Sequence, residues 1–124
     1  MADEEADQEV IESESIKYSQ VIDDPDEHAE RDGRSLVTRN HDVIREWAEA
    51  RGATPASVEG SEHDGHVGVL RFDFPGGATD LMHISWDDWF DAFDARQLNF
   101  IYQERRSDGN ESNFFQLQNP ANDD

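Results

Sequence analysis

The chain of 124 residues has the length of one small domain, carries 30 acidic side chains against 10 basic ones, and contains no cysteine. The absence of cysteine excludes disulfides, thiolate metal sites and cysteine nucleophiles. The excess of acid leaves no basic face of the kind that binds phosphates, so we expect no direct binding of nucleic acid.

The acidic excess is spread over the whole chain. Residues 1–35 carry 13 acidic and 3 basic side chains, and residues 36–124 carry 17 and 7. A net charge of −20 must repel itself in dilute solution, whereas at molar salt the Debye length falls to about 3 Å and the repulsion largely disappears. We therefore interpret the chain as a halophilic protein surrounded by counter-ions at high salt. The alternative is an acidic surface that meets a basic partner or mimics nucleic acid.

The beginning of the chain, MADEEADQEV, contains neither a basic region nor an apolar region of a signal peptide. No run of the sequence approaches the roughly 18 apolar residues of a membrane span. We therefore expect a cytoplasmic protein without a membrane partner.

Residues 1–35 are rich in charge and poor in large apolar side chains. Such a segment cannot bury enough surface to offset the entropy of ordering, so the sequence predicts an acidic, mostly disordered and flexible tail. Residues 36–119 are then a single domain, and residues 120–124 a disordered C-terminal tail. Four apolar side chains could pin part of the N-terminal tail onto the domain as a short extended segment: Ile16, Tyr18, Val21 and Ile22.

A first helix is predicted between Asn40, which can cap its start, and Gly52, which can end it. Its apolar side chains recur on one stripe, at Val43, Ile44, Trp47 and Ala48. Residues 55–59 could form a short strand, and the turn residues of 60–65 follow it.

Residues 67–74, VGVLRFDF, alternate along the chain and predict a strand that directs Leu70, Phe72 and Phe74 toward a core. The sequence Pro-Gly-Gly at 75–77 ends this strand in a turn. Residues 81–84 can form a brief extended piece before the next helix.

The segment ISWDDWFDAF, residues 84–93, predicts a second helix. Ser85 can cap it, and Asp88 stands three residues later as in a shortened capping box. Asp87 and Asp88 lie in the first turn, where the helix dipole favours carboxylates. We interpret the aspartates as cap and solvated face, and four aromatic side chains at helical spacing as core: Trp86, Trp89, Phe90 and Phe93.

The last part of the domain reads as a hairpin. Residues 98–104 and 112–119 are rich in strand formers, and the loop between them contains Asp108, Gly109 and Asn110. The full order of elements is helix, strand, strand, helix, strand, strand. It predicts an α+β fold in which two helices pack on one face of a small three- to four-stranded antiparallel or mixed sheet.

Several of these motifs together resemble a known family. The stretches HDVIREWAEARG, GVLRFDF, ISWDDWFDAFD, FIYQE and SNFFQL are similar, in order and spacing, to motifs of a family of small uncharacterised bacterial and archaeal proteins. The resemblance covers roughly residues 36 to 117. Members are sometimes labelled 1,4-alpha-glucan branching enzymes, but the barrel of such an enzyme needs about 250 residues. The resemblance implies the division into elements and implies no function.

Two catalytic or metal-binding patterns deserve comparison with simpler explanations. Among 30 acids, Asp73 and the pair Asp87 and Asp88 are the best candidates for a glycoside hydrolase, but helix capping already explains the pair. His63 and His66, with His83 further along, could hold a divalent metal, although the Asp-Gly between the first two is also turn chemistry. We assign no catalytic residue, metal ligand or cofactor. A metal-dependent binder or small enzyme that uses His63, His66, His83 and nearby acids is kept as an alternative.

The chain has three tryptophans, two tyrosines and seven phenylalanines, more rings than a domain of this size can hide completely. Aromatic and arginine side chains that remain on the surface are typical of protein interfaces. The leading hypothesis is therefore a non-enzymatic protein-interaction module whose partner is another protein. The candidate binding residues are Arg71, Trp86, Trp89, Arg105, Arg106 and Phe114.

Overall fold

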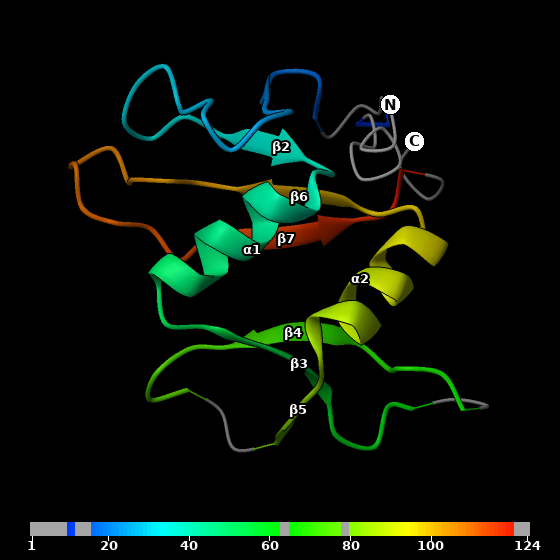
Figure 1. Cartoon of the computed structure of the whole chain (residues 1–124). Helices are drawn as coiled ribbons and strands as arrows, with labels where there is room; N and C mark the ends of the chain where they lie inside the picture. Colours follow the sequence, from blue (N-terminus) through cyan, green and yellow to red (C-terminus); the bar gives the residue numbers. More distant parts are fainter. Residues whose placement is uncertain (1–9, 12–15, 63–64, 78–79, 121–124) are drawn as a thin grey trace. The chain divides into compact units, whose positions relative to one another are not determined.

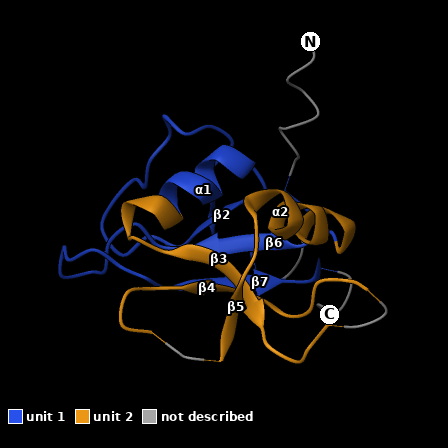
Figure 2. Cartoon of the chain, turned by 60° about the horizontal axis from the view of Figure 1, so that its bottom comes forward, with its two compact units in different colours: residues 1–47, 97–124 blue, residues 48–96 orange. Residues whose placement is uncertain are grey.

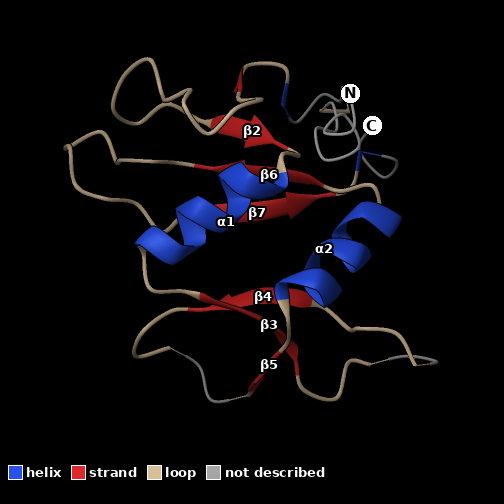
Figure 3. Cartoon of the chain, in the orientation of Figure 1, coloured by secondary structure: helices blue, strands red, loops and turns tan. Residues whose placement is uncertain are grey.

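The structure is a computed structural model, and it describes residues 10–11, 16–62, 65–77 and 80–120. The chain divides into two compact units, of which unit 1 comprises residues 1–47 and 97–124 and unit 2 comprises residues 48–96 (Figure 2). The described elements are two helices and seven strands (Figure 1, Figure 3). The predicted α+β class is confirmed, and the strands are divided between two sheets, one in each unit.

The sheet of unit 1 has four strands in the order β1-β2-β6-β7. The strand β1 (Gln20–Val21) is parallel to β2 (Leu36–Thr38), whereas β6 (Asn99–Tyr102) is antiparallel to both β2 and β7 (Phe115–Gln118). Every residue of the two inner strands is buried. These strands are therefore covered on both faces, and the core of unit 1 lies around them.

The segment before residue 36 contributes to this core, which differs from the predicted tail over residues 1–35. Ile16 is only 3% exposed and packs against Val37 and Ile101. Of the four side chains predicted to pin the tail, two are buried, Ile16 and Ile22, and two are exposed, Tyr18 and Val21. Part of the predicted tail, residues 1–9 and 12–15, lies outside the described residues.

The helix α1 (His41–Ala50) is capped as predicted, because Asn40 Oδ1 accepts a hydrogen bond from the Val43 N–H at 3.0 Å. At its end, the N–H groups of Gly52 and Ala53 donate to carbonyls of the last turn, and Gly52 has a φ of 70°. This is the glycine termination that the sequence predicted. Within unit 1, Trp47 packs edge-on against rings of β6 and β7, those of Phe100, Tyr102 and Phe115.

Unit 2 contains a three-stranded antiparallel sheet in the order β4-β3-β5. Its strands are β3 (Thr54–Val58), β4 (Leu70–Asp73) and β5 (Leu81–His83). The strand β4 begins later than the predicted residue 67. The guanidinium of Arg96 binds the carbonyls of Val67 and Gly68 instead, so these residues lie outside the strand.

The helix α2 (Trp86–Ala95) packs on β3 and β4. Ser85 Oγ accepts from the Asp88 N–H at 3.0 Å, which confirms the predicted cap. The core of unit 2 is aromatic, because Trp89 stacks on Phe72 and Phe93 at centroid distances of 4.9 and 5.5 Å. Neither helix within the described ranges has the length and apolar character that crossing a membrane requires.

Candidate functional site

Two of the predicted binding residues, Arg106 and Phe114, line the same open hollow in unit 1. The hollow has a volume of about 460 Å³ and lies where the loop between β6 and β7 begins and ends. Phe114 is 50% exposed, which places half of a large apolar side chain in water. The other lining residues are polar: Gln103, Glu111, Ser112 and Asn113.

Backbone hydrogen bonds close the loop on one side of the hollow. Arg105 forms an isolated bridge with Glu111, and the Arg106 N–H donates to the Asn110 carbonyl at 2.7 Å. The Gly109 N–H donates back to the Arg106 carbonyl at 2.8 Å, in a turn that gives Gly109 a φ of 88°. Only glycine adopts this conformation without strain. The loop therefore fixes the backbone of Arg106.

The Asp108 carboxylate at the tip of this loop binds the loop backbone. Asp108 Oδ1 accepts from the Asn110 N–H at 3.0 Å, as in an Asx-turn. This backbone hydrogen bond lowers the pKa of the Asp108 carboxyl below its ordinary value, and the neighbouring Arg106 guanidinium lowers it further. The charged form of Asp108 is thus the form that the turn favours.

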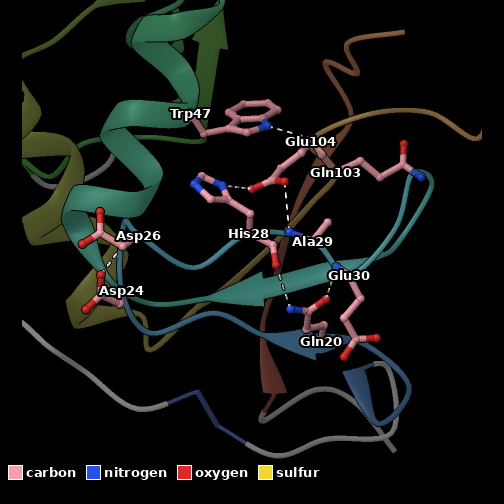
Figure 4. Close-up of polar contacts among 9 residues, drawn as sticks. All are labelled: Gln20, Asp24, Asp26, His28, Ala29, Glu30, Trp47, Gln103 and Glu104. Atoms are coloured by element: carbon pink, nitrogen blue, oxygen red, sulfur yellow. Dashed lines mark hydrogen bonds and ion pairs between the residues drawn. The ribbon is translucent and has the colours of Figure 1, made fainter. Parts of the chain in front are cut away.

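A chain of hydrogen bonds joins two lining residues of the hollow, Gln103 and Ser112, to the buried core. The Trp47 Nε1–H donates to the Gln103 carbonyl at 2.8 Å (Figure 4). Ser112 Oγ donates to Gln103 Oε1 at 2.9 Å and accepts from the Phe114 N–H at 3.1 Å. Gln103 Nε2 also donates to the Gly33 carbonyl at 3.2 Å. The backbone that carries Phe114 is therefore preorganised from the core outward.

Glu104 follows Gln103 after the end of β6, and its side chain binds the loop that precedes β2. Its carboxylate accepts from the Ala29 N–H at 3.0 Å and lies 2.9 Å from His28 Nδ1 (Figure 4). Gln20 adds two contacts to the same loop, donating to the His28 carbonyl and accepting from the Glu30 N–H. The side chain of His28 is 70% exposed, so its contact with Glu104 contributes little to stability. The hydrogen bonds to the backbone of residues 28–30 carry most of this attachment.

The remaining predicted binding residues do not line this hollow. Arg105 is exposed, and its guanidinium donates to the Gly109 carbonyl at 3.1 Å. Arg71, Trp86 and Trp89 belong to unit 2. Arg71 is exposed and Trp86 is partly buried. Trp89 is 0% exposed, and its indole N–H donates to the Arg71 carbonyl at 3.0 Å. Trp89 is therefore a core residue, and we withdraw it from the candidate binding residues.

The two described histidines of the metal-binding alternative, His66 and His83, have different neighbours. His63 lies outside the described residues, and His66 lines a second open hollow with Ser61 and Arg96. His83 Nε2 lies 2.7 Å from Asp73 Oδ2, and the two side chains come from the strands on either side of β3. Among the residues that the structure describes, no three His, Cys, Asp or Glu side chains are grouped so that they could hold a metal ion.

Sequence reasoning found Arg106 and Phe114 but missed the polar residues that fix them. Ser112 is 3% exposed although it is polar, and it bonds to the backbone two residues later. Serine three residues before a strand is a usable turn signal. The role of Gln103 depends on Trp47, which is distant in sequence, so no local pattern predicts it.

No protein-family model matches the chain, and no curated protein or solved structure matches it either. The family resemblance of residues 36 to 117 therefore stays a prediction.

Proposed function

We propose that the protein is a non-enzymatic interaction module that binds a segment of another protein at the hollow of Arg106 and Phe114. The observation that carries the proposal is a half-exposed phenylalanine beside an arginine in a preorganised hollow. Aromatic and arginine side chains are enriched at the centres of protein interfaces, where they dominate the binding energy. Because the hydrogen bonds of Gln103 and Ser112 already order the site, binding costs little further entropy.

The lining residues indicate the chemistry of the partner. Phe114 requires an apolar side chain, and Arg106 requires a carboxylate or a backbone carbonyl. Glu111 and Asn113 add hydrogen-bond acceptors to the same lining. At molar salt the Debye length is about 3 Å, so an exposed ion pair with Arg106 adds selectivity rather than much affinity. The apolar contact with Phe114 then supplies most of the binding energy.

The size of the hollow indicates a weak and reversible complex. Fully burying a phenylalanine contributes about 1.5–3 kcal/mol, and half of the Phe114 surface is already covered. Interfaces that bury less than about 1,200 Å² belong to transient encounters. We therefore expect dissociation constants on the order of micromolar.

A selection from a random peptide library on the full chain, at about 2 M KCl, tests the proposal. We expect the selected peptides to contain an aromatic or aliphatic residue near an acidic one. Phe114→Ser should weaken them about threefold to tenfold, and Arg106→Gln by about twofold. Tyr18→Ser is the matched control, because Tyr18 is an 80% exposed ring that is not among the residues lining the hollow. Peptides that lose affinity with Tyr18→Ser, or that ignore Phe114→Ser, would overturn the proposal.

A metal-dependent binder or small enzyme is the second candidate, and the contact of His83 with Asp73 supports it. A carboxylate that holds an imidazole in this way can orient it as a base or as a metal ligand. Zinc titration followed by the imidazole NMR signals tests this candidate. Saturation at one equivalent that His83→Gln abolishes would favour it over the interaction module. The acidic mimic of nucleic acid has only the net charge of −20 in its support.

We further propose that the protein works in a cytoplasm of high salt. The support is the charge of −20 spread over both halves of the chain, because such repulsion is tolerable only when counter-ions screen it.

A further inference from the structure

A buried side-chain amide in unit 1 binds the backbone of a residue far away in the sequence. Asn99, the first residue of β6, is 0% exposed. Its Oδ1 accepts from the Ile11 N–H at 3.1 Å, and its Nδ2 donates to the Ile11 carbonyl at 2.8 Å. Both backbone groups of one residue are thus bound by one side chain, as a neighbouring strand would bind them. This recognition depends on the backbone of Ile11 and not on its side chain.

A second amide completes the site and leaves one donor unused. Gln118 is the register partner of Asn99 in β7, and its Oε1 accepts from Asn99 Nδ2 at 3.0 Å. The residue is only 6% exposed, and among the described residues Gln118 Nε2 has no hydrogen-bond partner. A buried donor without a partner is unfavourable, because nothing compensates the loss of its hydration. The site therefore offers one more donor than the segment bound to it uses.

An apolar surface lies beside these amides. Val10 packs against the cluster of Ile16, Val37 and Ile101. The segment is thus held by its backbone at one residue and by an aliphatic side chain at the residue before it. In the sequence, Val10 and Ile11 stand between two glutamates, which defines the occupant as an aliphatic pair in an acidic segment.

We propose that Asn99 and Gln118 form a peptide-binding site that Val10 and Ile11 occupy from within the same chain, and that an extended segment of another protein can replace them. The replacing segment has two adjacent aliphatic residues among acids, and a further carbonyl that accepts from Gln118 Nε2. The site is separate from the Phe114 hollow, because Asn99 pairs with Gln118 at one end of β6 and β7, whereas Gln103 and Phe114 meet beyond the other end. It does not depend on the proposed function.

The covalent link makes the internal segment a strong competitor. A tethered ligand has an effective concentration in the millimolar range. If it fills the site for about nine tenths of the time, the apparent affinity for an external segment falls about tenfold. Release of Ile11 from Asn99 should therefore expose an affinity that the wild-type chain masks.

The test compares the full chain with its Ile11→Pro variant, which lacks the N–H that Asn99 accepts. Ile11→Val is the matched control, because it keeps the N–H and an aliphatic side chain. The probe is a labelled peptide with the sequence of residues 7–13, DQEVIES, at about 2 M KCl. We expect it to bind Ile11→Pro about tenfold more tightly than the wild type or Ile11→Val. The NMR signals of the Asn99 and Gln118 side-chain amides should shift as it binds.

The same peptide with an N-methyl group on its isoleucine tests the backbone contact without a change in the protein. It should bind Ile11→Pro at least about tenfold more weakly, because the donated N–H is lost. Equal binding of both peptides, or no binding to a folded Ile11→Pro variant, would overturn the proposal. An unfolded Ile11→Pro variant would also overturn it, because the segment would then be an essential part of the fold. A wild-type dimer that Ile11→Pro abolishes would make a second copy of the chain the occupant, which contradicts the partner proposed here.

Discussion

The indole of Trp47 connects the core of unit 1 to the hollow, so we predict that Trp47→Phe changes both. The side chain is 5% exposed, lies against rings of β6 and β7, and donates its Nε1–H to the Gln103 carbonyl at 2.8 Å. Phenylalanine keeps a ring at this position but removes the donor. The Gln103 carbonyl then loses its hydrogen bond to the core, so this lining residue of the hollow is held less firmly.

The expected loss of stability follows from two contributions. Loss of the hydrogen bond to the part-buried Gln103 carbonyl costs about 1–2 kcal/mol. Replacement of indole by phenyl removes buried apolar atoms and leaves a small cavity, which costs about 1–2 kcal/mol more. We therefore expect Trp47→Phe to lower the free energy of unfolding by about 2–4 kcal/mol and the melting temperature by roughly 10 °C.

Urea unfolding followed by circular dichroism at about 2 M KCl measures this loss. Trp86→Phe is the matched control, because Trp86 is only partly buried, and it should cost less than half as much. A loss below about 1 kcal/mol for Trp47→Phe, or one no larger than for Trp86→Phe, would refute the reasoning, since the indole hydrogen bond would then contribute nothing measurable.

Four further outcomes are expected. Asn40→Ala should lower the free energy of unfolding by about 1–2 kcal/mol in urea titrations, whereas Asn40→Asp should retain most of it, because aspartate keeps the oxygen that caps α1. Gly68→Ala should lower the melting temperature, and the double variant with Ser61→Ala should not restore it, because the new Cβ would lie 2.6 Å from the Ser61 carbonyl carbon as well as against its side chain. NMR titration should show a pKa for Asp108 below the ordinary aspartate value. The stabilisation by the Asp108 carboxylate is then complete at a pH above the ordinary pKa and is lost as the pH falls through the lowered pKa. Asp108→Asn should remove this pH dependence. The free energy of unfolding should rise between about 0.1 M and about 2 M KCl, and a constant value would contradict the halophilic proposal.

The features that could be predicted from the sequence are those that neighbouring residues determine. Asn40 and Ser85 each cap a helix with an oxygen that binds a backbone N–H three residues later. Gly52 takes the positive φ that ends α1, and the alternation of residues 70–73 places Leu70 and Phe72 inside. Each of these signals acts within one turn or one strand, so a single sequence is enough to show it.

The features that could not be predicted depend on residues distant in the chain. The strand β1 has only two residues, and it exists because Gln20 pairs with Leu36. The spacing of the four aromatic residues of α2 predicts that all of them lie on one buried face. In the structure, Trp86 is partly exposed and Trp89 is fully buried. The difference comes from what packs against each ring, which spacing does not contain. The division of the strands between two sheets is a pairing outcome of the same kind.

The candidate site shows the same division between local and distant causes. Arg106 and Phe114 could be proposed because their residue types are typical of interfaces. They line one hollow because the bridge between Arg105 and Glu111 brings the two sides of the loop together. The hollow is ordered by the hydrogen bond between Gln103 and Ser112. Asn99 could not be predicted as a site residue. A polar residue within a segment rich in strand formers does not indicate that its side chain binds the backbone of Ile11.

The most direct test of the central claim is an amide NMR titration of the full chain with a peptide selected on it, at about 2 M KCl. The interaction module predicts that the saturable shifts occur at Gln103, Arg106 and Ser112 to Phe114, and that Phe114→Ser moves their midpoint to a higher peptide concentration while the spectrum stays dispersed. Saturable shifts centred on His83 and Asp73 in unit 2, with none around Phe114, would contradict it.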